Sequence, residues 1–174
     1  MKRLGAVAAL SALAAACATV GGGAPETARA ELKNPGGLTV GTATFTEVSG
    51  GVRVVLEARG LPAGARAVHV HDVGRCEPPG FNSAGGHFNP GKRQHGILNP
   101  AGPHAGDLPN LTVGPDGTGR LETTTDRFTL GAGPTSVFDT DGSALVVHAA
   151  PDDFRTDPTG NSGGRAACGV IVGD

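Results

Sequence analysis

The stretch that decides the fold is LTVGTATFTEVSGGVRVVLEA, residues 38–58. Residues 38–45 alternate along the chain as a strand does, and the apolar run 52–58 follows the Ser-Gly-Gly turn signal at 49–51. Side chains of a strand point alternately to its two faces, so two such runs around a short glycine turn predict a β-hairpin. The folded body is therefore expected to begin near Leu38.

The rest of the chain repeats this pattern without helical periodicity beyond its first sixteen residues. Thirty glycines and thirteen prolines, with no Trp or Tyr, describe a loop-rich chain with a core of Val, Leu, Ile, Ala and six Phe. Several short strands between turn signals predict one all-β domain over 38–174, a sandwich or barrel. Its further candidate strands are Ala65–His71, Gly119–Thr125, Ser143–Ala149 and Ala166–Val172.

The N-terminus has the pattern of an export signal. Lys2 and Arg3 precede an apolar run to Ala16 that is too short to span a bilayer, so residues 1–16 are predicted to be a signal peptide. Three alanines before Cys17 are similar to a bacterial lipobox, although Leu13 lies one position too early for the usual aliphatic residue. We expect a lipidated Cys17 and a flexible tether over 17–37; conventional cleavage nearby is the alternative.

Charge and cysteine content agree with export. Loss of residues 1–16 removes two positive charges and moves the formal net charge from −2 to −4, which argues against a nucleic-acid partner. Cys76 and Cys168 can pair in an oxidising compartment, whereas Cys17 would be an odd thiol unless it is lipidated. The expected location is the periplasm or cell envelope, with membrane contact only through Cys17.

A long segment between the strands contains most of the histidines. About forty residues separate His71 from Leu111 with almost no apolar alternation, and a loop of this length in a compact domain is usually functional or disordered. It contains Cys76 and three of the six histidines, His87, His95 and His104. A disulfide and a metal are therefore the candidates for holding it in place.

Each histidine motif also has an ordinary explanation. His69 and His71 share one face of a strand, as an exposed pair would. His87, His95 and His104 with Asp107 suit tetrahedral zinc, but loop residues facing water look the same. His148 ends the strand A-L-V-V-H, as a buried core histidine often does. Because all six histidines fall in these three places, the pattern favours a metal site.

Five motifs in this order resemble the copper/zinc superoxide dismutase family, in its bacterial exported type. They are H-V-H at 69–71, S-A-G-G-H-F-N-P at 83–90, H-A-G-D-L-P-N-L at 104–111, L-V-V-H-A-A-P-D-D at 145–153 and G-G-R-A-A-C-G-V-I at 163–171. The resemblance covers Leu38–Val172. It implies a Greek-key antiparallel β-sandwich or flattened barrel with long metal-binding loops, copper and zinc as cofactors, and dismutation of superoxide.

The resemblance also implies a role for individual residues. The copper ligands would be His69, His71, His87 and His148, and the zinc ligands His87, His95, His104 and Asp107. His87 would bridge the two ions and act as ligand and acid while copper cycles between Cu(II) and Cu(I). Asp152 would link a copper histidine to a zinc histidine, Arg165 would hold the anion beside copper, and Cys76 would pair with Cys168.

Other interpretations remain open at this point. A periplasmic copper- or zinc-binding protein without turnover would keep the ligands but would not need Arg165 or Asp152. A structural domain on a lipid anchor would need none of these residues. Lys92, Arg93 and Arg155 are further candidates for attracting the anion, with plain solvated charges as the alternative, and the sequence is compatible with a monomer or a homodimer.

Overall fold

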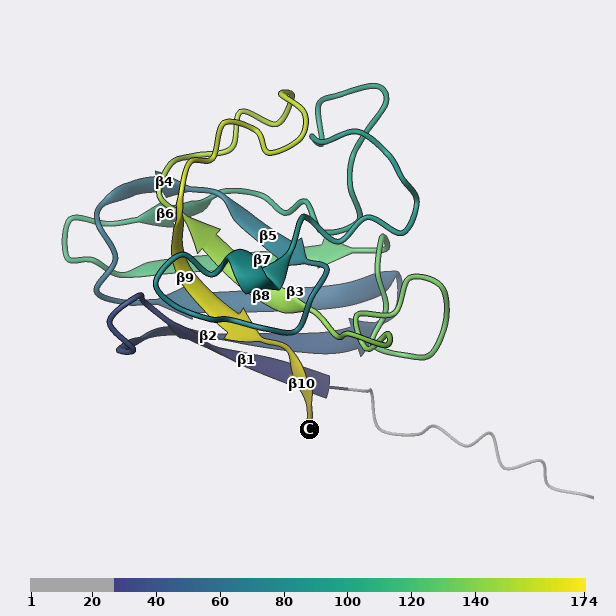
Figure 1. Ribbon diagram of the computed structural model, residues 1–174, viewed down its shortest axis with the longest axis horizontal. Coiled ribbons are helices and arrows are strands. Elements are labelled where there is room, and N and C mark those ends of the chain that lie inside the picture. Colours follow the sequence, from purple (N-terminus) through teal and green to yellow (C-terminus); the bar gives the residue numbers. More distant parts are fainter. Residues whose placement is uncertain (1–26) are drawn as a thin grey trace, which may run out of the picture.

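The computed structural model describes residues 27–174, and the predicted signal peptide, Cys17 and residues 18–26 of the predicted tether lie outside this range. Ten strands and one short 3-10 turn make up its regular structure (Figure 1). They are β1 (Thr27–Lys33), β2 (Thr39–Val48), β3 (Gly51–Ala58), β4 (Gly64–Arg66), β5 (Val68–His71), η1 (Asn82–Ala84), β6 (Leu111–Val113), β7 (Gly119–Thr125), β8 (Ala144–His148), β9 (Arg165–Val170) and β10 (Val172–Gly173).

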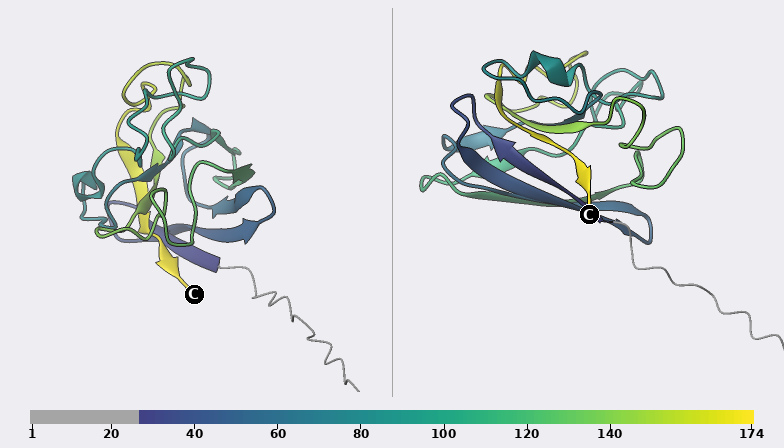
Figure 2. Two further views of the ribbon diagram at one scale, coloured as in Figure 1. Left: turned by 90° about the vertical axis from the view of Figure 1, so that its right-hand side faces the viewer. Right: turned by 60° about the horizontal axis from the view of Figure 1, so that its bottom comes forward.

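The strands form one antiparallel sheet that curls into a flattened, nearly closed barrel. Their order is β4-β6-β7-β3-β2-β1-β9-β8-β5, with β10 paired to β1. The two ends of this order, β4 and β5, are consecutive in the chain and are separated by Ala67 alone. The barrel is thus closed at this seam by the backbone itself, and Figure 2 shows the resulting two layers. The predicted all-β Greek-key fold is confirmed.

Arg66 fastens the same seam. Its guanidinium donates hydrogen bonds to the carbonyls of Pro62 and Ala63 and to that of Ala149, just after β8. Ala67 also exchanges main-chain hydrogen bonds with the end of β8, donating to Ala150 and accepting from His148. The seam is therefore held to β8, the strand that ends in His148.

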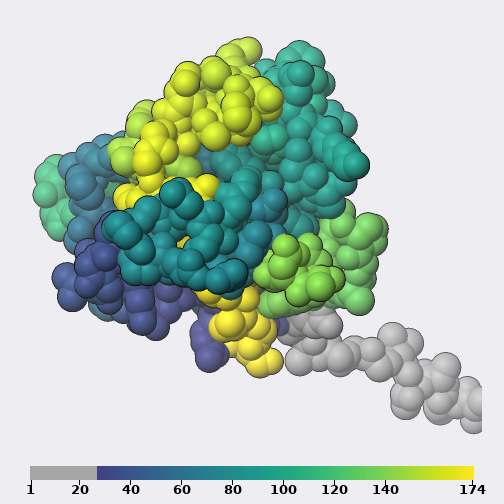
Figure 3. All heavy atoms as spheres, in the orientation of Figure 1, coloured from purple at the N-terminus to yellow at the C-terminus, as the bar shows by residue number. Residues whose placement is uncertain are grey.

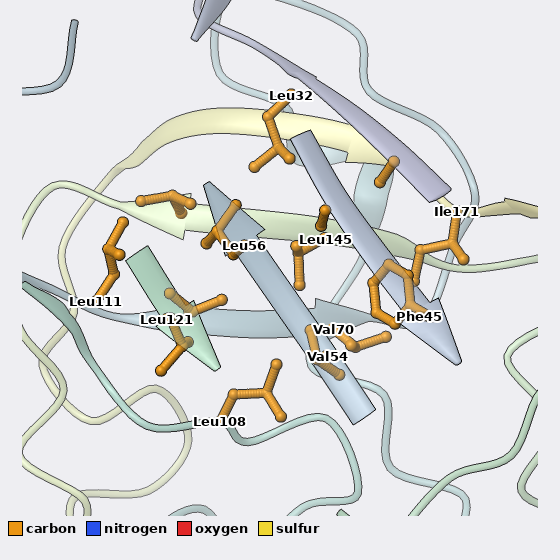
Figure 4. Packing of buried hydrophobic residues seen from close by; sticks show 14 of the residues in the cluster. Leu32, Phe45, Val54, Leu56, Val70, Leu108, Leu111, Leu121, Leu145 and Ile171 are labelled. Atoms are coloured by element: carbon orange, nitrogen blue, oxygen red, sulfur yellow. The ribbon is translucent and has the colours of Figure 1, made fainter. Parts of the chain in front are cut away.

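The interior of the barrel is a single apolar core. Alternate residues of β2, β3 and β7 point inward, and Phe45 lies 6.5 Å from Phe128 between ring centres. Figure 4 shows leucine, valine and phenylalanine side chains from both layers meeting between the strands. Removing this apolar surface from water is the main favourable contribution to folding.

The hairpin predicted from residues 38–58 forms β2 and β3, paired from Gly41↔Ala58 to Val48↔Gly51. Gly51 at the turn has φ 129°, and a Cβ there would collide with the main chain at Thr125. Glycine is therefore required where β3 begins beside the end of β7. The three-residue strand β6 was not among the sequence-based candidates because it is too short to show alternation.

The expectation that folding starts near Leu38 is wrong, because residues 27–37 of the predicted tether belong to the barrel. In β1, Ala28, Ala30 and Leu32 are buried and alternate with exposed residues. β1 pairs with β2 along its length and with β9 at Lys33, so it joins the two halves of the sheet. Alanine is a weak strand former, and this hid the alternation.

Two long loops, 72–110 and 149–164, cover part of the outside of the barrel (Figures 1 and 3). A disulfide joins Cys76 of the first loop to Cys168 in β9, with their Cα atoms 5.6 Å apart. This confirms the predicted pairing. Within residues 27–174, no helix has the length and apolar character needed to cross a membrane.

The role of β1 gives the first prediction. Leu32→Ala should lower the free energy of unfolding of the metal-free protein by about 2–5 kcal/mol, because it leaves a cavity in the core. Leu38→Ala, at a position that is 69% exposed, should change it by less than about 0.5 kcal/mol. Urea denaturation followed by circular dichroism measures both, and equal effects of the two substitutions would show that β1 contributes nothing to the core.

Candidate metal centre

The strands and loops bring every predicted site residue in the described part of the chain to one region. His69 and His71 come from β5 and His148 from the end of β8, two strands that are buried along their whole length. His87, His95, His104 and Asp107 come from loop 72–110, and Asp152 from loop 149–164. All six histidines are buried, the most exposed of them at 7%.

The first cluster contains His69, His71, His87 and His148. One ring nitrogen of each lies within 4.8 Å of those of the others. The Nε2 atoms of His71 and His148 are 3.4 Å apart. Nδ1 of His69 and Nε2 of His87 are buried without a hydrogen-bond partner in the described residues. Buried polar atoms are seldom left unpaired, so these two nitrogens indicate a missing electrophile such as a metal ion.

The opposite ring nitrogens of this cluster are occupied, which determines the tautomers. His69 Nε2 donates to Asp152 Oδ2 at 2.8 Å, and His71 Nδ1 donates to the carbonyl of Gly85 at 3.0 Å. His148 Nδ1 faces the carbonyl of Gly163 at 3.4 Å, which can only accept, and Ser162 Oγ at 3.2 Å. Because each proton is held on the outer nitrogen, the inner nitrogen keeps a lone pair for a cation.

The second cluster surrounds one carboxylate oxygen. Asp107 Oδ1 lies 3.0 Å from His87 Nδ1, 3.1 Å from His95 Nδ1 and 3.4 Å from His104 Nδ1. Zinc bonds to nitrogen are about 2.0–2.1 Å long, so the edge of a tetrahedral site is roughly 3.3 Å. Three nitrogens and one oxygen with these separations therefore fit a tetrahedral zinc ion.

His87 belongs to both clusters. Its Nδ1 lies beside Asp107 in the second cluster. Its Nε2 is one of the two buried nitrogens of the first cluster that have no hydrogen-bond partner in the described residues. The ring centre of His87 is 3.9 Å from that of His69 and 5.3 Å from that of His104. One imidazole thus offers a nitrogen to each of two adjacent sites.

Asp152 connects the clusters from the other side. Its Oδ2 accepts from His69, and its Oδ1 accepts from His95 Nε2 at 2.9 Å. Asn110 holds the backbone of Asp152 through two hydrogen bonds, accepting from its amide at 2.9 Å and donating to its carbonyl at 3.0 Å. Sequence reasoning missed Asn110, as well as Ser162 and the Gly85 carbonyl, because no local pattern marks a partner supplied by folding.

The charge states suit cation binding. Burial lowers the pKa of His71 to about 2, that of His87 to about 4 and that of His148 to about 3, so these rings are neutral near pH 7. Burial also opposes the charge of His95, but its hydrogen bonds to Asp107 and Asp152 outweigh this effect and raise its pKa to about 9. A metal ion must displace that proton, which couples binding to pH.

The two carboxyls remain ionised despite their burial. Desolvation alone would raise the pKa of Asp107 and of Asp152, but hydrogen bonds from the histidines hold both well below the usual value. The clusters therefore combine two negative charges with imidazoles that are neutral or, at His95, give up a proton when a metal binds. This set of donors is the one that borderline cations such as zinc and copper prefer.

Arg165 lies beside the first cluster, at the start of β9. Its guanidinium donates to the carbonyls of Phe81 and Gly85, and the Gly85 carbonyl also accepts from His71. The disulfide of Cys168, three residues further along β9, holds the same loop. Two of the three other candidate charges hold the loops, since Arg93 donates to the Gly102 carbonyl and Arg155 to that of Leu98.

Fold and site together define a β-barrel metalloprotein in which two adjacent metal sites share a histidine. The chain belongs to the copper/zinc superoxide dismutase family, whose model, described as "Copper/zinc superoxide dismutase (SODC)", matches residues 39–171.

Similar proteins of known name agree with this assignment. A copper-zinc superoxide dismutase of Aquifex aeolicus, its number 2, is 49% identical over 83% of this chain and 85% of its own. That of Deinococcus radiodurans is 43% identical over 90% and 88%. The crystal structure of a SOD-like protein from Bacillus subtilis superposes with a TM-score of 0.79 at 39% identity, covering 83% of this chain and 97% of the other.

Gly160 allows a test of the link through Asp152. It has φ 64°, and a Cβ there would collide with Asp152 Oδ1 and lie 2.6 Å from His95 Nε2. Gly160→Ala should therefore displace Asp152 and lower zinc affinity by about 10- to 100-fold. Gly142→Ala, at a similar φ of 67° and with no atom nearer than 3.6 Å to its Cβ, is the matched control. Competition with a chromophoric chelator measures zinc affinity, and equal affinities in the two variants would contradict this role.

Proposed function

We propose that this chain converts superoxide to oxygen and hydrogen peroxide, with copper held by His69, His71, His87 and His148 and zinc by His87, His95, His104 and Asp107. The observation that carries the proposal is the position of His87, whose two ring nitrogens point into different clusters. The protein is an oxidoreductase of its family, and the family's cofactors are copper and zinc.

The donor atoms support this division of ligands. His69, His87, His95 and Asp107 also have donor atoms within 4.8 Å of one another, which would exchange His104 for His69 in the zinc site. His104 is the better zinc ligand because its Nδ1 lies 3.4 Å from Asp107 Oδ1 and 3.3 Å from His87 Nδ1. His69 donates its Nε2 proton to Asp152, and its unpaired Nδ1 completes the copper set.

Bound copper supplies one-electron chemistry, taking an electron from one superoxide and giving it to a second, which becomes hydrogen peroxide with two protons. His87 contributes a buried ring nitrogen, Nε2, that can hold a proton next to the substrate. Its Nδ1 remains against Asp107. Zinc has no redox chemistry, and its ligands hold loop 72–110 and the His87 ring in position.

Arg165 provides the local positive charge that a negative protein needs for a negative substrate. Its bonds to the Phe81 and Gly85 carbonyls orient the guanidinium and use only part of its five donors. No carboxylate lies within 4 Å of this guanidinium in residues 27–174, so its charge is not neutralised by a direct ion pair. The remaining donors can hold a small anion beside the first cluster.

The alternative function, metal binding without turnover, is not favoured. Such a protein needs ligands, but it has no use for an arginine held beside the copper ligands. Arg165 bonds the same Gly85 carbonyl as His71, and Asp152 bonds His69 of the first cluster and His95 of the second. Dismutation therefore explains both the metal ligands and Arg165, whereas metal storage explains the ligands alone.

Activity of the metal-loaded protein, expressed from the full chain, tests the proposal. His148→Ala removes a copper donor and should abolish dismutation. Arg165→Ala should lower kcat/KM by about 10- to 100-fold while zinc content stays unchanged, and Arg165→Lys should recover part of the loss at low salt, because charge alone steers the anion. Pulse radiolysis measures the rates directly.

Arg75→Ala is the control, because Arg75 lies on loop 72–110, whose Phe81 and Gly85 carbonyls bond Arg165, but is exposed and pairs with Glu77 at 2.6 Å. Its activity should equal that of the parent protein. Full metal occupancy in the parent without dismutation would support the storage function instead, and equal losses from Arg75→Ala and Arg165→Ala would remove the steering role of Arg165.

The disulfide fits a protein that works outside the cytoplasm, in the periplasm or beyond the cell. We further propose that the chain is held in the cell envelope by lipid on Cys17. The supporting features are the charged start, the short apolar run and the three alanines before this cysteine.

Membrane attachment can be tested by detergent partitioning. The protein produced with its own N-terminus in a bacterial host should enter the detergent phase of Triton X-114 and carry a diacylglyceryl mass on Cys17, because acyl chains partition strongly into detergent and membranes. Cys17→Ala should move it to the aqueous phase. An unmodified N-terminus in the aqueous phase for the parent chain would favour conventional cleavage.

A further inference from the structure

A hollow of about 340 Å³ lies outside the metal centre, and none of the proposed metal ligands lines it. One side consists of loop 72–110, and the other consists of Arg127 and Thr135 from the segment between β7 and β8. In Figures 1 and 3 these two segments, teal and green, lie on the same side of the molecule. The residues from the loop are Asn89, Pro90, Gly91, Arg93, Gly102, Pro103 and Ala105.

The lining is positive and otherwise largely apolar. Its charged side chains are Arg93 and Arg127, and no carboxylate belongs to it. Two prolines, two glycines and an alanine supply most of the remaining surface. Strongly hydrated inorganic ions lose much of their hydration in such surroundings, whereas an organic anion can place an apolar part against the prolines.

Arg127 lines the hollow, and one donor of its guanidinium group has no acceptor among residues 27–174. Its Nη2 donates to the main-chain carbonyl of Asp107, while its Nε is buried without an acceptor in the described residues. Across residues 27–174, no acid lies within 4.0 Å of its guanidinium nitrogens. A buried cationic N–H without an acceptor is costly, and a carboxylate oxygen is a strong partner for it.

Arg93 is held in place beside the hollow. Its Nε and Nη2 both donate to the Gly102 carbonyl, at 2.9 and 2.6 Å. Asn89 exchanges two hydrogen bonds with the Arg93 backbone, at 2.8 and 3.0 Å, which fixes the turn between them. The second positive charge is thus positioned before any ligand arrives, which lowers the entropy lost on binding.

We propose that this hollow binds a small organic carboxylate, with its oxygens on Arg127 and its apolar part against Pro90, Pro103 and Ala105. The site is separate from the superoxide site and takes a different class of ligand. Because Arg127 also holds the Asp107 carbonyl, an occupant would restrain the loop that carries the proposed zinc ligands.

Titration with benzoate of the ¹⁵N-labelled protein, loaded with zinc and with copper kept in its diamagnetic reduced form, tests this site. The Nε–Hε signal of Arg127, identified by its loss in Arg127→Lys, should shift and saturate with a Kd of roughly 1 mM. Binding followed through nearby backbone amides should be weakened about tenfold in Arg127→Lys, because lysine lacks the forked donors. Arg59→Lys, an exposed position at the end of β3, should leave binding unchanged.

Thr135→Leu reduces the hollow from the opposite wall without touching either arginine. This variant should lose benzoate binding and keep its dismutase activity. It therefore tests the proposed site even if Arg127→Lys does not fold. An Arg127 signal that does not move, equal binding in Thr135→Leu, or equal affinity for inorganic phosphate would each overturn the proposal. Because the experiment measures benzoate binding, its result does not depend on whether the protein is an active dismutase.

Discussion

Two buried carboxylates, Asp107 and Asp152, hold four of the six histidines in one arrangement, and the rest of the site depends on them. Asp107 contacts the Nδ1 atoms of His87, His95 and His104, while Asp152 accepts from His69 and His95. An ionised carboxylate away from water is stable only when it is paired and hydrogen-bonded. The two loops and strand β5 therefore cannot shift past one another without leaving a buried charge unpaired.

The barrel and the loops contribute different kinds of restraint. Strands β5 and β8 are buried along their length, so the positions of His69, His71 and His148 are set by the sheet. The loops lack such pairing and need cross-links. The disulfide joins residues 92 apart in sequence, and closure of a loop of that length removes about 4–5 kcal/mol of chain entropy from the unfolded state in the chain-entropy model.

Five arginines in residues 27–174 bond to main-chain carbonyls and make no ion pair within 4 Å, and three of them hold the barrel seam or lie beside the metal centre. Arg66 bonds carbonyls across the barrel seam, Arg127 that of Asp107, and Arg165 those of Phe81 and Gly85. A carbonyl orients a guanidinium without cancelling its charge. These contacts therefore keep two positive charges available in a protein whose net charge is negative, Arg165 for superoxide and Arg127 for the ligand proposed above.

The sequence by itself determined the strands that it predicted from alternation, such as 52–58 and 119–125. It also determined which types of metal ligand are available, and its family resemblance implied the pairing of Cys76 with Cys168. It failed at β1, because alanines carry little strand preference and the neighbours that bury them are far away in the chain. Only the tertiary structure decided which nitrogen of each ring faces inward, since the partners that hold the outer protons, Asp152, Gly85 and Ser162, come from other segments. Residue type follows from the chain alone, but the direction of a lone pair depends on contacts that exist only after folding.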